Sequence, residues 1–142
     1  MSVEENKAAA RRFFEDVWTR GDVTQTSNFL AENFVAHNAF DIKIAGPDEY
    51  SRVVTAYREG FPDLVSTVED VLAEGDLVAV RGTDRGTHRG EFMGHLPTGR
   101  TVTTTWIVIY RMEGAKAAEG WLETDAKRLL EQVGEPPDPS SS

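Results

Sequence analysis

The sequence predicts an α+β fold in which N-terminal helices pack on one face of a curved, mainly antiparallel sheet. Three observations support this prediction. Apolar residues recur at helical spacing over the first part of the chain, they alternate with a period of two between residues 64 and 123, and one short helical segment follows. The chain has 142 residues, which suits a single core. We therefore expect one domain over residues 1–134 and a disordered tail over residues 135–142, which is rich in Pro and Ser.

Residues 3–19 predict an amphipathic helix, because apolar side chains recur every three or four positions and leave a charged face opposite. The apolar face comprises Ala10, Phe13, Phe14, Val17 and Trp18. Gly21 follows in the position of a helix C-cap. Residues 24–32 predict a second, shorter helix, and residues 34–38 predict a β-strand that opens into a loop.

A third helix is expected over residues 46–60. The sequence Gly46-Pro47-Asp48-Glu49 is typical of a helix start, since acidic residues in the first turn face the positive end of the helix dipole. Pro62 prevents the helix from continuing.

Alternating apolar residues then predict four strands, at residues 64–73, 77–88, 101–112 and 115–123. Glu74-Gly75-Asp76 and Glu113-Gly114 are expected to be the turns between neighbouring strands. Strand alternation places Trp106 and Tyr110 on one side of the third of these strands. Residues 125–133 predict a last helix.

Composition excludes several classes of function. The net charge of −9 disfavours binding to nucleic acid, and no stretch approaches the roughly 20 apolar residues that span a membrane. The chain has no cysteine, so disulfides, thiol catalysis and thiolate metal sites are excluded. Its three histidines are not spaced as metal ligands, and no glycine-rich phosphate loop precedes a helix. Both patterns make a metal site and a nucleotide site improbable. Because the N-terminus also lacks a secretory pattern, we expect a cytoplasmic protein.

Residues 86–99 contain four glycines and a proline, so the backbone must turn sharply there more than once. This segment carries His88 and His95, and we expect His95 to be exposed. His37 and His88 are candidate polar groups of a pocket, because a histidine titrates near neutral pH and can donate a proton to an enolate. The structural alternative for each is a ring that is hydrogen-bonded to a nearby loop backbone.

Two aspartates each have two interpretations. Asp125 is a candidate acid–base group if apolar walls raise its pKa, or else the N-cap of the last helix, where amide donors would lower that pKa. Asp84 shares the face of Val78 and Val80 if alternation holds through Gly82, and an interior carboxylate needs a partner or a raised pKa. The alternative is a bulge at Gly82 that turns Asp84 to solvent.

Aromatic residues are first of all expected in the core, because helical and strand spacing explains most of them. Those nearest the expected pocket are candidates for contact with a ring-shaped ligand. They are Phe14, Trp18, Trp106, Tyr110 and Trp121, the last as a wall of the pocket.

The chain resembles the SnoaL-like proteins, often called polyketide or ester cyclases, within the NTF2-like superfamily. The resemblance extends from about Asn6 to Gly134 and rests on short motifs in the expected order. They include Trp18-Thr19-Arg20-Gly21-Asp22, Phe34-Val35-Ala36-His37-Asn38, Phe61-Pro62-Asp63-Leu64, the segment from Gly86 to Gly94, Pro97-Thr98-Gly99, Glu119-Gly120-Trp121 and Leu130-Glu131-Gln132-Val133-Gly134.

This resemblance implies a cone-shaped barrel, in which a strongly bent sheet wraps around a long helix and leaves an apolar pocket. It also implies a homodimer that forms through the sheet, and an intramolecular aldol condensation without metal or organic cofactor. The proton acceptor and donor implied by the family motif is Asp125. The chain departs from the family pattern at Gly120, where a histidine is common, and at Asp84, where an apolar residue is usual.

Three functional hypotheses follow. In the first, the protein is a cyclase or isomerase that transfers protons on a small, mostly apolar carbonyl compound, with Asp125 as acid–base group and His88 or His37 as helper. In the second, it is a non-catalytic, dimeric protein that binds a small apolar ligand. A third hypothesis, epoxide hydrolysis, requires an inward-facing arginine between Asp84 and Asp125, and strand alternation argues against one.

Overall fold

The computed structural model describes residues 2–39 and 42–134. The helical elements are α1 (Val3–Phe13), the π-helix η1 (Phe14–Thr19), the short 3-10 helix η2 (Val23–Gln25), α2 (Thr26–Phe29), α3 (Gly46–Gly60) and α4 (Ala126–Val133). The strands are β1 (Leu30–Ala39), β2 (Ile42–Ala45), β3 (Val65–Glu74), β4 (Leu77–Thr87), β5 (Thr101–Glu113) and β6 (Lys116–Thr124). The α+β prediction is therefore confirmed. The expectation for residues 135–142 lies outside the described residues.

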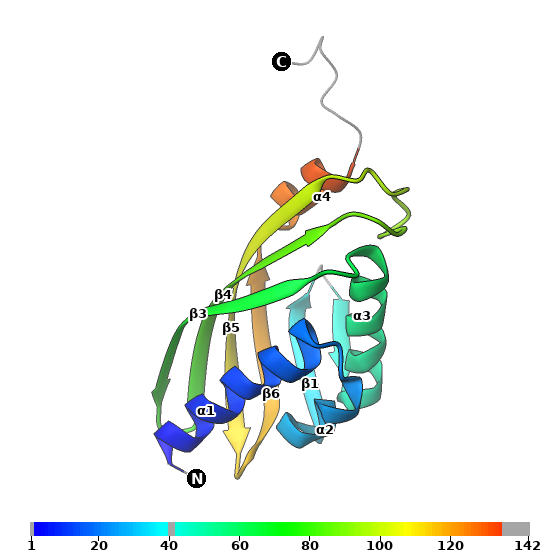
Figure 1. Ribbon diagram of the computed structural model, residues 1–142. Helices are drawn as coiled ribbons and strands as arrows, with labels where there is room; N and C mark the ends of the chain where they lie inside the picture. Colours follow the sequence, from blue (N-terminus) through cyan, green and yellow to red (C-terminus); the bar gives the residue numbers. More distant parts are fainter. Residues whose placement is uncertain (1, 40–41, 135–142) are drawn as a thin grey trace.

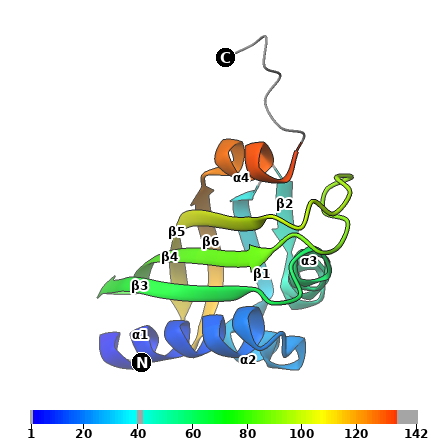
Figure 2. The ribbon, with the colours of Figure 1, turned by 45° about the horizontal axis from the view of Figure 1, so that its top comes forward.

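All six strands form one bent sheet in the order β2-β1-β6-β5-β4-β3 (Figures 1 and 2). Neighbouring strands are antiparallel except β1 and β6, which are parallel. Helix α1 lies across the strands, α3 runs beside β1, and α4 lies at the end of the sheet far from the N-terminus (Figure 1). Among the described residues, no helix has the length and apolar character needed to cross a bilayer.

The first predicted helix is confirmed, but it widens into a π-helix at Phe14. Ser2 and Glu5 cap its start reciprocally, so two free backbone N–H groups are satisfied there. Gly21 ends the segment with a φ of +74°, and the Arg58 side chain occupies the space in which a Cβ would lie. The turn widens where Phe14 and Trp18 face the interior, and such π-turns are frequent at functional sites.

The predicted helix over residues 24–32 is wrong beyond Phe29, because β1 begins at Leu30. Leu30 lies opposite Ala117 of β6, and the pairing of a whole strand outweighs a weak local preference for helix. The short strand β2 was not predicted. The helix over residues 46–60 and the four later strands lie within one residue of their predicted ends.

The core lies between the helices and the inner face of the sheet. Alternation holds along β4, so that Val78 and Val80 are buried and Asp84 points to the same side. The pairing of β4 with β5 runs without interruption from Leu77 to Thr87. The alternative of a bulge at Gly82 that exposes Asp84 is therefore wrong.

Candidate functional site

A cavity of about 130 Å³ lies between the helices and the inner face of the sheet. Most of its lining is apolar or aromatic, contributed by η1, α3 and all six strands. The aromatic residues that line it are Phe14, Trp18, Phe34, Tyr50, Tyr57, Trp106 and Tyr110. Among the described residues in this lining, Asp84 is the one with a side chain that is charged at neutral pH. The cavity thus combines a single carboxylate with walls that solvate charge poorly.

Asp84 is held by two hydrogen bonds to the same carboxylate oxygen. The Ser66 hydroxyl donates to Oδ1 at 2.6 Å, and the Trp106 indole N–H donates to Oδ1 at 2.8 Å. Burial raises the pKa of Asp84 to about 6, and the two hydrogen bonds act in the opposite direction. Asp84 therefore exchanges its proton in the pH range where a general base is most useful.

Gly82 and Phe14 fix the orientation of the Trp106 indole. A Cβ at residue 82 would overlap the indole ring, so glycine lets the ring lie directly against β4. On its other side the ring stacks on Phe14, with centroids 4.6 Å apart and planes at 25°. The indole N–H is consequently held toward Asp84 before any ligand arrives.

Two tyrosines of α3 complete the polar part of the cavity. Tyr50 accepts a hydrogen bond of 2.9 Å from the Trp18 indole N–H, and burial raises the pKa of both Tyr50 and Tyr57. Both phenols are therefore neutral donors at physiological pH. Tyr50, Tyr57 and Ser66 are not among the site residues expected from the sequence. The seven-residue spacing of the two tyrosines, which places them on one face of α3, was the signal that could have found them.

Tyr110 and Phe34 fill the space beside Gly120. A Cβ at residue 120 would lie 3.1 Å from Cδ1 of Tyr110 and 3.3 Å from Cζ of Phe34. The histidine common at this position in the family would therefore have to displace one of these rings. Residue 120 does line the cavity, but here it contributes backbone only.

Asp125 does not look into this cavity, contrary to the expectation for a family-type acid–base group. In β6, Gly120, Leu122 and Thr124 face the cavity, and the chain then turns into α4. Asp125 is exposed, and its carboxylate accepts a hydrogen bond of 3.1 Å from the Arg128 backbone N–H. The alternative interpretation, a helix N-cap, describes its contacts.

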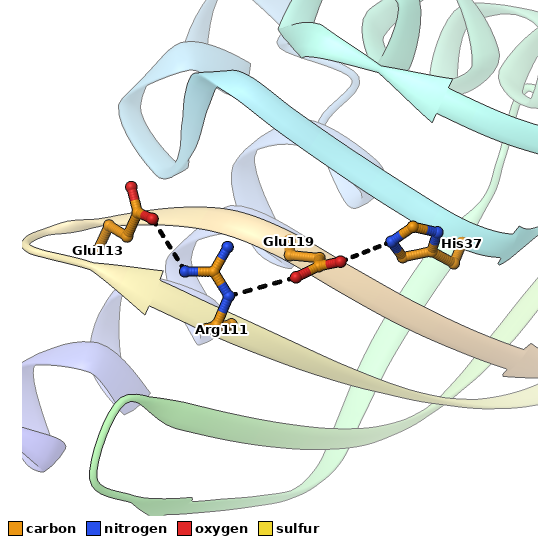
Figure 3. A network of polar contacts seen from close by, with 4 residues as sticks. All are labelled: His37, Arg111, Glu113 and Glu119. Carbon is orange, nitrogen blue, oxygen red and sulfur yellow. Dashed lines mark hydrogen bonds and ion pairs between the residues drawn. The ribbon is translucent and has the colours of Figure 1, made fainter.

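His37 and Trp121 lie side by side on the outer face of the sheet. Figure 3 shows His37 beside Glu119. Strand alternation turns His37 away from the cavity, because its neighbour Ala36 faces inward. Its Nε2 lies 2.7 Å from Glu119 Oε2, and its ring stacks on Trp121 at a centroid distance of 5.7 Å. Glu119 also contacts Arg111 at 3.3 Å. The expected positions of His37 as pocket donor and Trp121 as pocket wall are therefore wrong.

His88 is completely buried, but it lies outside the cavity lining. Its Nδ1 accepts a hydrogen bond of 3.3 Å from the Thr98 backbone N–H, and its ring lies against Phe61. Burial lowers the pKa of His88, so the ring is neutral and anchors the loop over residues 89–100. The loop-bonded interpretation describes its contacts. His95 is half-buried rather than exposed, and its backbone pairs with Phe92.

The Asp–Arg–Asp arrangement required for epoxide hydrolysis is not assembled in the described part of the chain. Arg81 lies on the outer face, where it pairs with Asp70 at 2.7 Å. Over residues 2–39 and 42–134, no three His, Cys, Asp or Glu side chains cluster closely enough to hold a metal ion. Of the nine residues singled out from the sequence, the structure brings together Asp84, Phe14, Trp18, Trp106 and Tyr110 around the cavity.

Comparisons with a family model and with solved structures point to the same family. A sequence model of the SnoaL-like polyketide cyclase family matches residues 8–133. AclR from Streptomyces galilaeus, a candidate hydroxylase, is 31% identical with a TM-score of 0.85, over 96% of this chain and 85% of AclR. IdmH, a candidate polyketide cyclase from Streptomyces antibioticus, is 28% identical with a TM-score of 0.75, over 95% of this chain and 100% of IdmH.

A candidate SnoaL-like polyketide cyclase from Jannaschia sp. CCS1 shares the fold, with a TM-score of 0.85, 24% identity and 94% coverage of both chains. Comparison with curated proteins gives no match. Because the family match spans almost the whole described domain and the fold agrees, this chain belongs to the SnoaL-like polyketide cyclase family.

Proposed function

We propose that this protein is a cofactor-free cyclase or isomerase that transfers protons on a small, mostly apolar carbonyl compound, with Asp84 as the acid–base group. The observation that carries this proposal is a single carboxylate in an aromatic cavity, with its pKa raised to about 6. A base of this strength at neutral pH is suited to removing a proton from carbon next to a carbonyl group.

The two oxygens of Asp84 have different tasks in this mechanism. Oδ1 accepts the bonds from Ser66 and Trp106, which fix the carboxylate in the cavity. Among the described residues, no hydrogen bond to Oδ2 is recorded, so this oxygen is available to the substrate. Oδ2 takes the proton from the acidic carbon, and the electron pair of the broken C–H bond passes into the enolate.

In the aldol reaction the enolate carbon then attacks a second carbonyl carbon of the same molecule. A carbon–carbon bond forms, the attacked carbonyl oxygen becomes an alkoxide, and protonated Asp84 returns its proton to that oxygen. In an isomerisation the substrate has a β,γ double bond, so loss of the α proton gives a conjugated dienolate. Protonated Asp84 then returns its proton to the γ carbon, and the double bond moves to the α,β position. Either series of steps returns Asp84 to its ionised form.

The cavity also limits what can sit beside Asp84. An apolar cavity of about 150 Å³ binds one benzene molecule, and the cavity here has about 130 Å³. We therefore expect one ring of the substrate at a time to occupy the space next to the carboxylate.

Hydrogen–deuterium exchange at carbon tests this proposal without knowledge of the natural substrate. The protein is incubated in deuterated buffer with 2-tetralone, 2-indanone and ethyl 2-oxocyclohexanecarboxylate, and exchange at the acidic carbon is followed by proton NMR. We expect catalysed exchange that rises with pH through a midpoint of about 6. Asp84→Asn should slow it by about 10²–10⁴-fold, the range typical of general base catalysis.

Asp125→Asn is the matched control, because it changes the family-type aspartate outside the cavity. This variant should retain the wild-type rate and pH profile, and circular dichroism should show that both variants are folded. Full exchange activity in Asp84→Asn, or loss of activity in Asp125→Asn alone, would show that the role of Asp84 is assigned wrongly.

The second candidate function is non-catalytic binding of a small apolar ligand. One observation favours it: residue 120 is glycine and contributes no polar side chain to the cavity. This function predicts a ligand that remains bound through purification, seen by native mass spectrometry, and no exchange with any of the three ketones.

A further inference from the structure

A single hydroxyl at the end of η1 bonds to both backbone groups of one residue in β3. Thr19 Oγ1 accepts a hydrogen bond of 3.0 Å from the Ser66 backbone N–H and donates one of 3.2 Å to the Ser66 carbonyl oxygen. β3 is an edge strand, with β4 on one side and no further strand of the described chain on the other. Backbone groups at such an edge lack strand partners, so the Thr19 hydroxyl takes the place that a neighbouring strand would have.

This contact shows which kind of strand pair Ser66 forms with Asp84. The two residues lie directly opposite each other in antiparallel strands, and the backbone groups of Ser66 point away from β4, toward Thr19. Opposite residues of this kind exchange no backbone hydrogen bond, and their side chains lie closer together than those of a hydrogen-bonded pair. The Ser66 hydroxyl can therefore reach Oδ1 of Asp84 at 2.6 Å.

Arg58 of α3 holds the segments on both sides of the contact between Thr19 and Ser66. Its Nη1 donates to the Trp18 carbonyl oxygen at 2.8 Å and to the Leu64 carbonyl oxygen at 3.1 Å. Trp18 directly precedes the threonine, and Leu64 lies two positions before the serine. The end of η1 and the start of β3 are consequently held together at two neighbouring places.

We propose that Thr19 is a positioning residue for the candidate base: it holds Ser66 so that the Ser66 hydroxyl stays against Asp84. Thr19 itself lies outside the cavity lining, so it acts on the carboxylate through Ser66. Its importance for catalysis rests on the proposed function of Asp84. A donor that stays against a carboxylate favours the charged form, so Thr19 keeps the base ready to accept a proton at neutral pH.

The surroundings of Asp84 make its titration a specific measure of the hydrogen bonds that its carboxylate accepts. Within the described residues, the other titratable side chains of the cavity lining are phenols, namely Tyr50 and Tyr57 of α3 and Tyr110 of β5. Burial raises the pKa of all three phenols, so they stay neutral in the range where Asp84 titrates.

Carbon-13 NMR titration of the Asp84 carboxyl in Thr19→Val tests this role, because valine keeps the shape of threonine and removes its hydroxyl. The hydrogen bond from Ser66 lowers the pKa of Asp84, so its loss should raise the midpoint. We expect Ser66→Ala to raise the midpoint by about 1 pH unit, and Thr19→Val to raise it by about half as much or more. Thr19→Ser keeps the hydroxyl and should titrate as the wild type does. The pH midpoint of ketone exchange should move in parallel.

The double variant Thr19→Val/Ser66→Ala distinguishes positioning from a general loosening of the fold. Its midpoint should equal that of Ser66→Ala alone, because the hydroxyl that Thr19 positions is already absent. Thr67→Val is the matched control. Thr67 follows Ser66 in β3 and is exposed on the opposite side of the strand, so this variant should leave the midpoint unchanged.

Two results would overturn the role of Thr19. One is a wild-type midpoint in folded Thr19→Val, and the other is a further rise when Thr19→Val is added to Ser66→Ala. Circular dichroism shows whether each variant is folded, and Thr19→Ala replaces Thr19→Val if valine prevents folding. A shifted midpoint in Thr19→Val without catalysed exchange in the wild type would support the positioning role and contradict the proposed function, so the two failures are distinguishable.

Discussion

Asp84 places a charge where the surrounding residues solvate it poorly, and this costs folding free energy. Its pKa of about 6 in the folded protein lies above the ordinary value of 3.8, so the folded state binds this proton more tightly than the unfolded state. The stability that this group contributes is present below about pH 4 and is lost as pH rises through about 6. A pKa difference of this size corresponds to about 3 kcal/mol.

We predict that replacing Asp84 by asparagine makes the protein relatively more stable as pH rises. The free energy of unfolding is measured by urea denaturation of the wild type and of Asp84→Asn at several values between pH 4 and pH 7. The wild type should lose about 2 kcal/mol relative to the variant over this range, most of the full difference. A difference between the two proteins that does not change with pH would contradict a buried, ionising Asp84.

Two directions for Asp84 were possible from the sequence, and the uninterrupted pairing of β4 with β5 decides for the inward one that strand alternation predicts. The environment of the carboxylate could not be predicted. The donors Ser66 and Trp106 come from β3 and β5, and the covering ring of Phe14 comes from η1. Contacts between residues this distant in sequence leave no local pattern. For the same reason Asp125 was misplaced, because the family motif specifies a position in the chain and not the direction of a side chain.

At the scale of elements, the long alternating strands were predictable and the short or irregular elements were not. β5 buries every second residue along most of its length, which gives a clear period of two. β2 has four residues, too few for a pattern, and it forms only because β1 lies beside it. The parallel pairing of β1 with β6 joins distant segments and likewise has no local signal.

Gly82 is the position in β4 where a single added Cβ atom would disturb both the packing against Trp106 and the candidate site. We predict that Gly82→Ala destabilises the protein by about 1–3 kcal/mol, because the new Cβ overlaps the Trp106 ring and forces it to move. The displaced indole then donates less well to Asp84. Thermal or urea unfolding measures the loss of stability of Gly82→Ala relative to the wild type.

Thr83→Ala is the control for this substitution, since residue 83 is the next along β4 and its side chain leaves the opposite face. Thr83→Ala should lower the free energy of unfolding clearly less than Gly82→Ala does. Equal stability of wild type and Gly82→Ala would show that the space beside Trp106 is not filled as described.

At the scale of the whole molecule, the outer face of the sheet carries large apolar side chains without a cover from the described residues. Ile107 and Ile109 of β5 and Trp121 of β6 are 49%, 40% and 36% exposed. Charged side chains of both signs lie beside these apolar residues, including the ion pair between Arg111 and Glu119 (Figure 3). Soluble monomers rarely expose a large apolar patch. A face that combines apolar residues with both charges can complement itself across a two-fold axis.

We therefore propose that two copies of the chain pair through this face, and we predict that Ile107→Glu dissociates them. Sedimentation velocity should give a dimer for the wild type and a monomer for the variant. Leu96→Glu is the control, because Leu96 is 75% exposed in the loop between β4 and β5, away from this face. A wild type that is monomeric at all concentrations, or an Ile107→Glu dimer, would contradict the proposed interface.

The ionisation of Asp84 in the folded protein is the quantity on which the account of this cavity depends. Carbon-13 NMR of selectively labelled aspartate carboxyls measures it directly, with Asp84→Asn used to assign the resonance. We predict a titration midpoint of about 6 for this carboxyl. A midpoint near the ordinary value of 3.8 would mean that the cavity does not turn this aspartate into a base for neutral pH.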